Sequence, residues 1–170
     1  LPVRGARGVY GDLYLPSSAP PWPIVIAIGG SEGGSTITNE LARTFVHDGY
    51  LVFALSYWGL ETLPQNIDRI PLEYFLSAIE VAKEYPGAKA DKIAVIGVSR
   101  GSEAALLVGS VSSQVKAVVS VVGSGLSWPA WDVWTEPSWT FADAGVGYVP
   151  WANVPSMRRT FSDGGVEVTL

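Results

Sequence analysis

The sequence contains no cysteine and a single histidine, His47, and both scarcities limit its chemistry. Without cysteine it can form no disulfide bond, no thiolate metal site and no cysteine nucleophile. No apolar run approaches the ~20 residues that span a bilayer. The N-terminus has neither an apolar signal core nor a basic amphipathic transit segment. We therefore expect a cytoplasmic protein without a membrane span, and neither a metal nor a cofactor.

Basic residues are also few, with 11 Lys and Arg against 16 Asp and Glu and a net charge of −5. This balance argues against nucleic acid as a partner. Hydrophobic residues, in contrast, make up 48% of the 170 positions, which is typical of a compact fold. The length suits one domain. We therefore expect residues 1–170 to form a single unit, with a Trp-rich segment at about 125–155.

Apolar β-branched runs alternate with amphipathic stretches along the chain. Strands buried on both faces are predicted at 24–30, 50–59, 92–99 and 115–125. Helices are predicted at 35–49, 70–87 and 100–113, with Pro71 in the first turn of the second. An edge strand or hairpin arm is predicted at 8–16. The alternation predicts an α/β fold with a mostly parallel sheet flanked by helices.

Three of the predicted strands end in glycine-containing loops, "GGSEGG", "SYWG" and "GVSRG". The carboxyl ends of parallel strands meet at one edge of the sheet, where ligands of such folds bind. We therefore expect the three loops to converge there.

The loop "GVSRG" places Ser99 between Gly97 and Gly101, after a β-branched strand and before an Ala- and Leu-rich helix. A bare Gly-x-Ser-x-Gly match arises by chance, but this context is that of a nucleophile held on a sharp strand-to-helix turn. Small neighbours are needed because side chains there would collide with the backbone. The helix N-terminus favours a developing oxyanion. Ser99 is therefore the predicted catalytic nucleophile.

The loop "AIGGSEGG", residues 27–34, follows an earlier strand. In a serine hydrolase of this type, one oxyanion amide comes from the residue after the nucleophile, here Arg100, and another from such an earlier loop. We expect Gly30 and Ser31 to contribute to this oxyanion hole. A plain turn or a phosphate loop is the alternative, although the P-loop and G-x-G-x-x-G patterns both fail to match.

A general base and its acid partner are missing from the sequence pattern. His47 precedes Ser99 and sits at the end of its predicted helix away from the strand carboxyl ends, so we expect a surface histidine. The acids after Ser99 follow no convincing strand; they are Asp132, Asp143 and Asp163. We expect Glu103, one turn into the helix, to have a structural role, for example as a partner of Arg100.

Tryptophans recur every three residues at Trp128, Trp131 and Trp134, and another, Trp58, lies in "SYWG". Large aromatics of this kind are equally typical of core packing and of a lid or acyl pocket over the serine. Both interpretations stay open, and these four residues are candidates for a substrate pocket.

Taken as a set, "PIVIAIGGSEGG", "LARTFVHDGYLVFALSYWG" and "KIAVIGVSRGSEAALL" resemble the acyl-CoA thioesterase / bile acid-CoA:amino acid N-acyltransferase family. These proteins are α/β-hydrolases close to the dienelactone hydrolases, and the resemblance covers about residues 13–124. It implies an α/β-hydrolase fold with Ser99 as nucleophile and the amides of Ser31 and Arg100 as oxyanion donors. The acyltransferases of the family use cysteine at the nucleophile position, so a serine favours hydrolysis of an ester or thioester, with a small-molecule acyl ester or thioester as the substrate.

Members of this family continue into two further strands, which are followed by an Asp and a His. This sequence ends roughly where those elements should begin, so we expect it to be the N-terminal portion of the fold. In the first hypothesis, a companion chain or a missing C-terminal part supplies the last two strands with the Asp and His. The second is a catalytically inactive acyl-binding module, and the third is a structural subunit whose exposed strand edge pairs with another protein.

Overall fold

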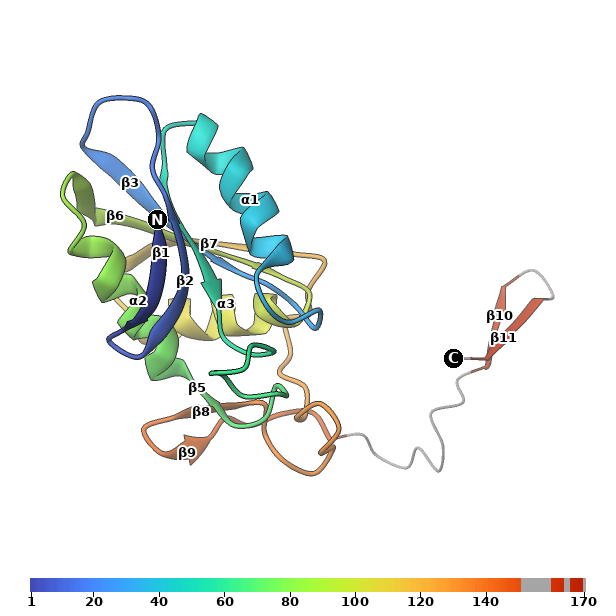
Figure 1. Ribbon diagram of the computed structural model, residues 1–170. Helices are drawn as coiled ribbons and strands as arrows, with labels where there is room; N and C mark the ends of the chain where they lie inside the picture. Colours follow the sequence, from blue (N-terminus) through green and yellow to red (C-terminus); the bar gives the residue numbers. More distant parts are fainter. Residues whose placement is uncertain (151–159, 164–165, 170) are drawn as a thin grey trace.

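A central six-stranded sheet organises the protein, in the strand order β1-β2-β4-β3-β6-β7 (Figure 1). The computed structural model describes residues 1–150, 160–163 and 166–169. β4, β3, β6 and β7 run parallel, while β2 pairs antiparallel with both β1 and β4. The expected mostly parallel sheet and the hairpin arm near the N-terminus are confirmed. The strands are β1 (Pro2–Ala6), β2 (Val9–Tyr14), β3 (Trp22–Ile28), β4 (Leu51–Ser56), β6 (Ala88–Val98) and β7 (Val115–Val121).

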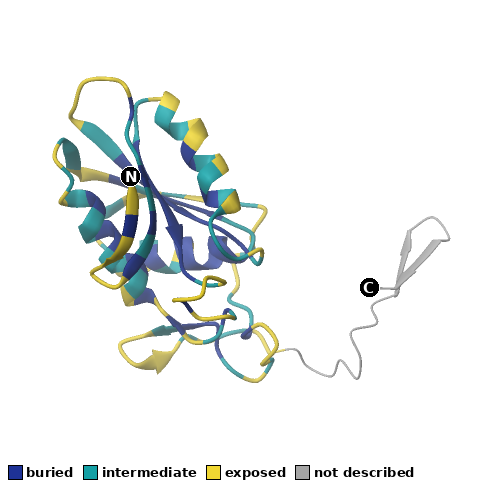
Figure 2. Ribbon diagram, viewed as in Figure 1, coloured by how far each residue is buried: buried dark blue, intermediate teal, exposed yellow. Residues whose placement is uncertain are grey.

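Three helices cover the two faces of this sheet, α1 on one face and α2 and α3 on the other (Figure 1). Because strand side chains alternate between faces, Val25 and Ala27 of β3 pack toward α1. Ile24 and Ile26 join the cluster that contains Phe75 of α2. The central strands are the darkest region of Figure 2 because both of their faces are covered. The helices are α1 (Thr36–His47), α2 (Leu72–Lys83) and α3 (Arg100–Val111).

A smaller sheet, in the order β5-β8-β9, lies below the main one in Figure 1. Its first strand takes up Ile70 and Pro71, so Pro71 is extended (φ −72°, ψ 131°) and α2 begins one residue later. The expectation that Pro71 lies in the first helical turn was therefore wrong, because pairing with β8 holds it in a strand. These strands are β5 (Ile70–Pro71), β8 (Trp139–Phe141) and β9 (Ala144–Gly145); an antiparallel pair, β10 (Thr160–Asp163) and β11 (Val166–Thr169), follows.

β7 differs from the fully buried strand that its apolar sequence predicts. It is the last strand of the sheet in the described part of the chain, and none of its residues is fully buried. Val119 is 46% exposed, and Val122, just after the strand, is 84% exposed. Burial was predicted from the apolar run alone, whereas a strand is covered only if a neighbour lies beside it. This edge is therefore apolar and unpaired in the described structure.

Candidate active site

Loops at the carboxyl ends of β3, β4 and β6 meet at one point, as the sequence predicted. The amide of Gly34 donates to the carbonyl of Trp58 across 2.9 Å, which joins the first two loops. A Cβ placed on Gly30 would lie 2.9 Å from the Cβ of Ser99, which brings the third loop against the first. Ser99 and the residues around Gly30, far apart in sequence, are thus direct neighbours.

Ser99 occupies a sharp turn between β6 and α3, with φ 53° and ψ −120°. For a non-glycine residue such backbone angles cost about 1–3 kcal/mol and persist only where the surroundings impose them. Here the amide of Ser99 donates to the carbonyl of Val121 at 2.9 Å, and the hydroxyl of Ser102 donates to the carbonyl of Gly97 at 2.8 Å. The turn is held by β7 and by its own helix, and leaves the Ser99 side chain half-buried.

Gly97 and Gly101 allow this turn because backbone passes where their side chains would be. A Cβ on Gly97 would lie 2.1 Å from the carbonyl oxygen of Gly101. A Cβ on Gly101 would lie 2.2 Å from the carbonyl oxygen of Gly29. Neither position can hold a larger residue without backbone movement, which explains why small residues flank Ser99.

The predicted oxyanion amides differ in their hydrogen bonds. The amide of Gly30 faces the carboxylate of Glu32, with both oxygens 3.0 Å from the nitrogen. Within the described residues, the amides of Ser31 and Arg100 donate to no protein group. Arg100 is the first residue of α3, where backbone N–H groups have no intrahelical acceptor. Arg100 directly follows Ser99, and Ser31 directly follows Gly30, which lies against Ser99.

Arg100 and Glu103 form a buried ion pair on the first turn of α3, with Nη1 and Oε1 2.9 Å apart. The carboxylate of Glu103 also accepts the indole N–H of Trp139 at 3.0 Å and the amide of Trp128 at 3.1 Å. The guanidinium of Arg100 donates to the carbonyl of Pro129 at 2.9 Å. Burial raises the pKa of Glu103, opposed by these hydrogen bonds, and lowers the pKa of Arg100. The pair fastens the Trp-rich segment to the helix that carries the site.

The tryptophans differ in burial and contacts, and a pocket role for any of them stays a prediction. Trp139 is fully buried, with its ring centroid 5.9 Å from that of Tyr57. Trp131 is 40% exposed and its ring lies 5.8 Å from that of Trp134. Trp58 donates its indole N–H to the carbonyl of Gly30 at 3.0 Å. Trp139 therefore belongs to the core, Trp58 braces the loop beside Ser99, and residues 151–155 of the predicted segment lie outside the described residues.

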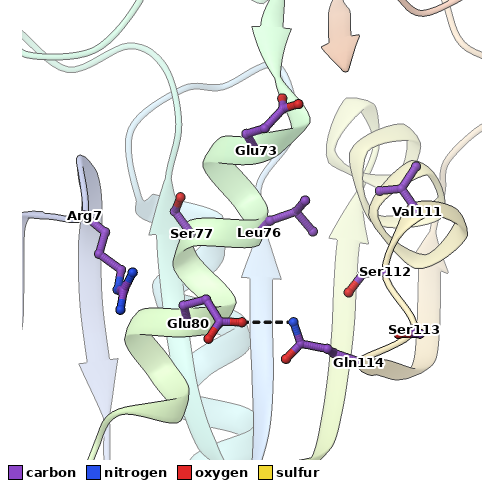
Figure 3. Close-up of a pocket in the computed structure, with 9 residues that line it drawn as sticks. All are labelled: Arg7, Glu73, Leu76, Ser77, Glu80, Val111, Ser112, Ser113 and Gln114. Atoms are coloured by element: carbon purple, nitrogen blue, oxygen red, sulfur yellow. Dashed lines mark hydrogen bonds between the residues drawn. The ribbon is translucent and has the colours of Figure 1, made fainter. Parts of the chain in front are cut away.

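A hollow of about 430 Å³ lies away from this site, between α2, the turn after α3 and the β1–β2 turn (Figure 3). Two of its lining residues are hydrogen bonded, Gln114 donating to Glu80 at 2.9 Å, and Lys83 donates to Gln114 at 2.6 Å. Lys83 also donates to the carboxylate of Glu80 at 2.9 Å, and this hydrogen bond, followed by the one from Gln114, lowers the pKa of Glu80. The network joins α2 to the segment after α3, so we assign it a structural role.

His47 is exposed at the end of α1, as expected, and β4 begins just after it at Leu51. It therefore lies at the amino ends of the strands, opposite Ser99. Asp132 and Asp143 are exposed, and the side chain of Asp163 lies outside the described residues. Among the residues that the structure describes, no histidine accompanies Ser99 and no group of three or more His, Asp or Glu could hold a metal ion.

Sequence reasoning missed the roles of Tyr57 and Glu32. Both lie within the loops predicted to converge, "SYWG" and "GGSEGG", but their partners are carbonyl and amide groups that no side-chain motif reveals. No described helix combines the length and apolarity needed to cross a bilayer.

Comparisons with known proteins relate the chain to one family. The profile of the family described as BAAT / Acyl-CoA thioester hydrolase C terminal matches residues 70–147. Human acyl-coenzyme A thioesterase 1 is 32% identical over 123 residues, which are 72% of this chain and 28% of that protein. Mouse peroxisomal succinyl-coenzyme A thioesterase is 32% identical over 127 residues, 75% of this chain and 30% of that protein. The chain thus spans less than a third of the length of these relatives.

Solved structures support the fold independently. An α/β hydrolase from a Penicillium species superimposes with a TM-score of 0.62 at 20% identity, covering 75% of this chain and 46% of that one. A dienelactone hydrolase homologue from Klebsiella pneumoniae gives 0.59 at 20% identity, covering 81% and 67%. At this identity the likeness concerns the fold alone. The chain therefore has an α/β-hydrolase fold and is similar to the C-terminal domain of the BAAT and acyl-CoA thioester hydrolase family.

Proposed function

We propose that this protein hydrolyses an ester or thioester through an acyl intermediate on Ser99. The observation that carries the proposal is the strained backbone of Ser99, φ 53° and ψ −120°, at the tip of β6 with Gly30 against its side chain. Such strain recurs at functional sites, where the fold imposes it to present a reactive group. The amides of Ser31 and Arg100 are the proposed oxyanion donors, since Glu32 occupies the amide of Gly30.

In the first half of the reaction, Ser99 Oγ forms a bond to the acyl carbon. Its proton passes to a general base, and the carbonyl oxygen becomes an oxyanion near the two amides. Collapse of this tetrahedral species breaks the bond to the thiol or alcohol, which leaves with the proton. Water then attacks the acyl-serine by the same route and releases the carboxylic acid. Thioesters are the favoured substrates, because the relatives at 32% identity are named as acyl-coenzyme A thioesterases.

The proposal places the general base and its acid partner outside the described residues, since no described histidine lies beside Ser99. A serine hydroxyl needs such a base to attack at neutral pH. The unpaired, apolar edge at β7, with Val119 and Val122 exposed, supports a neighbour that adds strands there and brings the Asp and His. We propose that a C-terminal continuation or a companion chain supplies both.

Replacement of Ser99 by alanine tests the enzymatic role. We expect hydrolysis of acyl-CoA and aryl esters to fall to background in Ser99→Ala. The control Ser110→Ala, at an exposed position of α3, should keep the activity of the parent. Intact mass and denaturing electrophoresis of the active material test the second part of the proposal. An active preparation that contains only these 170 residues would contradict the need for further residues.

The bare edge of β7 also favours a second candidate, a catalytically inactive acyl-binding or structural subunit. The two candidates differ in what Ser99→Ala changes. A binding or structural subunit keeps its partner and ligand after the substitution, whereas an enzyme keeps its fold and loses turnover.

A further inference from the structure

The carbonyls of Gly29 and Gly30 are held by two aromatic side chains from the end of β4. Trp58 donates its indole N–H to the carbonyl of Gly30 at 3.0 Å. The hydroxyl of Tyr57 lies 3.1 Å from the carbonyl oxygen of Gly29 and 3.3 Å from that of Gly30. Tyr57 can donate one hydrogen at a time, so it serves the two carbonyls jointly, and Trp58 supplies the second donor.

These contacts fix the direction of the amides that follow. In a trans peptide unit, the carbonyl of one residue and the N–H of the next point in opposite directions. The unit between Gly29 and Gly30 has Tyr57 at its carbonyl and the carboxylate of Glu32 at its N–H. The unit between Gly30 and Ser31 has Trp58 and Tyr57 at its carbonyl, so the Ser31 N–H is directed to the opposite side.

The two aromatic side chains are themselves rigidly placed. Tyr57 is buried, with its ring 5.3 Å from that of Phe75 and 5.9 Å from that of Trp139. Burial raises the pKa of its phenol, so the hydroxyl stays protonated and able to donate. The ring of Trp58 lies 3.4 Å from the position a Cβ on Gly33 would take. The hydrogen bond of Trp58 and the ring contacts of Tyr57 restrict the movement of both side chains.

We propose that Tyr57 and Trp58 are positioning residues that orient the Ser31 amide toward the oxyanion. The inference rests on the proposed function of Ser99 and adds to it a reason why this loop presents its amide correctly. Without the two donors, the Gly30–Ser31 peptide unit can rotate, because glycine resists little, and the amide then leaves the oxyanion. Loss of one oxyanion donor lowers kcat about 10²–10³-fold, which sets the upper limit of the effect.

The test removes each donor while keeping the ring. Trp58 is replaced by benzothienylalanine, in which sulfur takes the place of the indole N–H, and Tyr57 by phenylalanine. Trp22, whose indole N–H donates to the carbonyl of Ser18 at 2.8 Å at the amino end of β3, receives the same replacement as a control. The measurements are kcat and KM for a thioester substrate and the affinity for a boronic acid that forms a tetrahedral adduct with serine.

We expect about a 10- to 100-fold fall in kcat and in boronate affinity for the Trp58 and Tyr57 variants, with KM within about twofold of the parent. The Trp22 variant should match the parent in all three. A purely structural role would lower stability or the active fraction, without a selective loss of tetrahedral-adduct binding. Unchanged kcat and boronate affinity in both variants would overturn the inference, and if Ser99→Ala is inactive, the proposed function survives. Full activity in Ser99→Ala would overturn both.

Discussion

Gly101 gives the sharpest test of how the site is built, because this second residue of α3 lies against the end of β3. In Gly101→Ala the new Cβ would lie 2.2 Å from the carbonyl oxygen of Gly29 and 2.6 Å from that of Ile28. Both obstacles are backbone, at the last residue of β3 and at the residue after it, so no side chain can swing away to make room. The helix must move, and it carries the Arg100 amide and the turn at Ser99 with it.

The expected cost follows from that overlap. Forcing additional atoms into a packed interior costs typically 1–3 kcal/mol. Since the clash is with rigid backbone, we expect about 3 kcal/mol, the upper end of that range. A matched change is Gly125→Ala, because a Cβ there would meet no atom within 4 Å and the backbone angle is unstrained. It should change the free energy of unfolding by less than about 0.5 kcal/mol.

Urea unfolding followed by tryptophan fluorescence measures both variants, and Ser99 acylation by an activated ester measures the site. Gly101→Ala should unfold at lower urea and acylate at least tenfold more slowly in its folded fraction. Equal stability and equal acylation rates for the Gly101 and Gly125 variants would refute the close approach of α3 to β3 described above.

Three further predictions concern buried and titrating groups. Glu103→Ala leaves buried donors without their carboxylate and should cost about 3 kcal/mol of unfolding free energy. The control Glu40→Ala breaks an exposed ion pair and should cost less than about 1 kcal/mol. Equal losses of unfolding free energy in urea titration would argue against the buried pair. Burial raises the pKa of Tyr74 to about 12, above its ordinary 10.0. The contribution of the neutral phenol to folding stability is therefore full below pH 10 and is lost as the pH rises toward 12. Tyr74→Phe should lose less stability across that interval, and parallel plots of unfolding free energy against pH for the two proteins would contradict this. Hydrogen bonds from Lys83 and Gln114 lower the pKa of Glu80, so the parent should lose stability more steeply than Glu80→Gln on acidification below about pH 4.5. Because Glu80 is partly exposed, the difference in unfolding free energy should be no more than about 1 kcal/mol. A steeper loss in the variant would reverse the assigned sign.

The parts of the fold that the sequence predicted are those set by local pattern. Apolar β-branched runs around Ile24, Leu51 and Ile93 indicated central strands, and all three residues are buried. Glycines at strand ends indicated converging loops, and Gly34 does bond to the loop that contains Trp58. Both kinds of signal report on neighbours close in sequence, and the parallel α/β topology then follows from a small set of allowed arrangements.

Features that depend on distant partners could not be predicted in this way. Val119 has the sequence environment of a core residue, and its exposure arises from the place of β7 at the end of the sheet. Trp139 lies in a segment without periodicity, yet it is fully buried because its indole N–H donates to Glu103 and its ring packs near that of Tyr57. The contact of Glu32 with the Gly30 amide is short-range, but a carboxylate in a glycine-rich loop carries no distinctive pattern.

The central claim, that Ser99 is the acylated nucleophile, is tested most directly by a fluorophosphonate probe. The probe is added to an active preparation, the protein is digested, and the modified peptide is located by mass spectrometry. We predict a single adduct on Ser99 whose formation parallels the loss of hydrolysis. An adduct on another residue, or complete loss of activity without modification of Ser99, would contradict the claim.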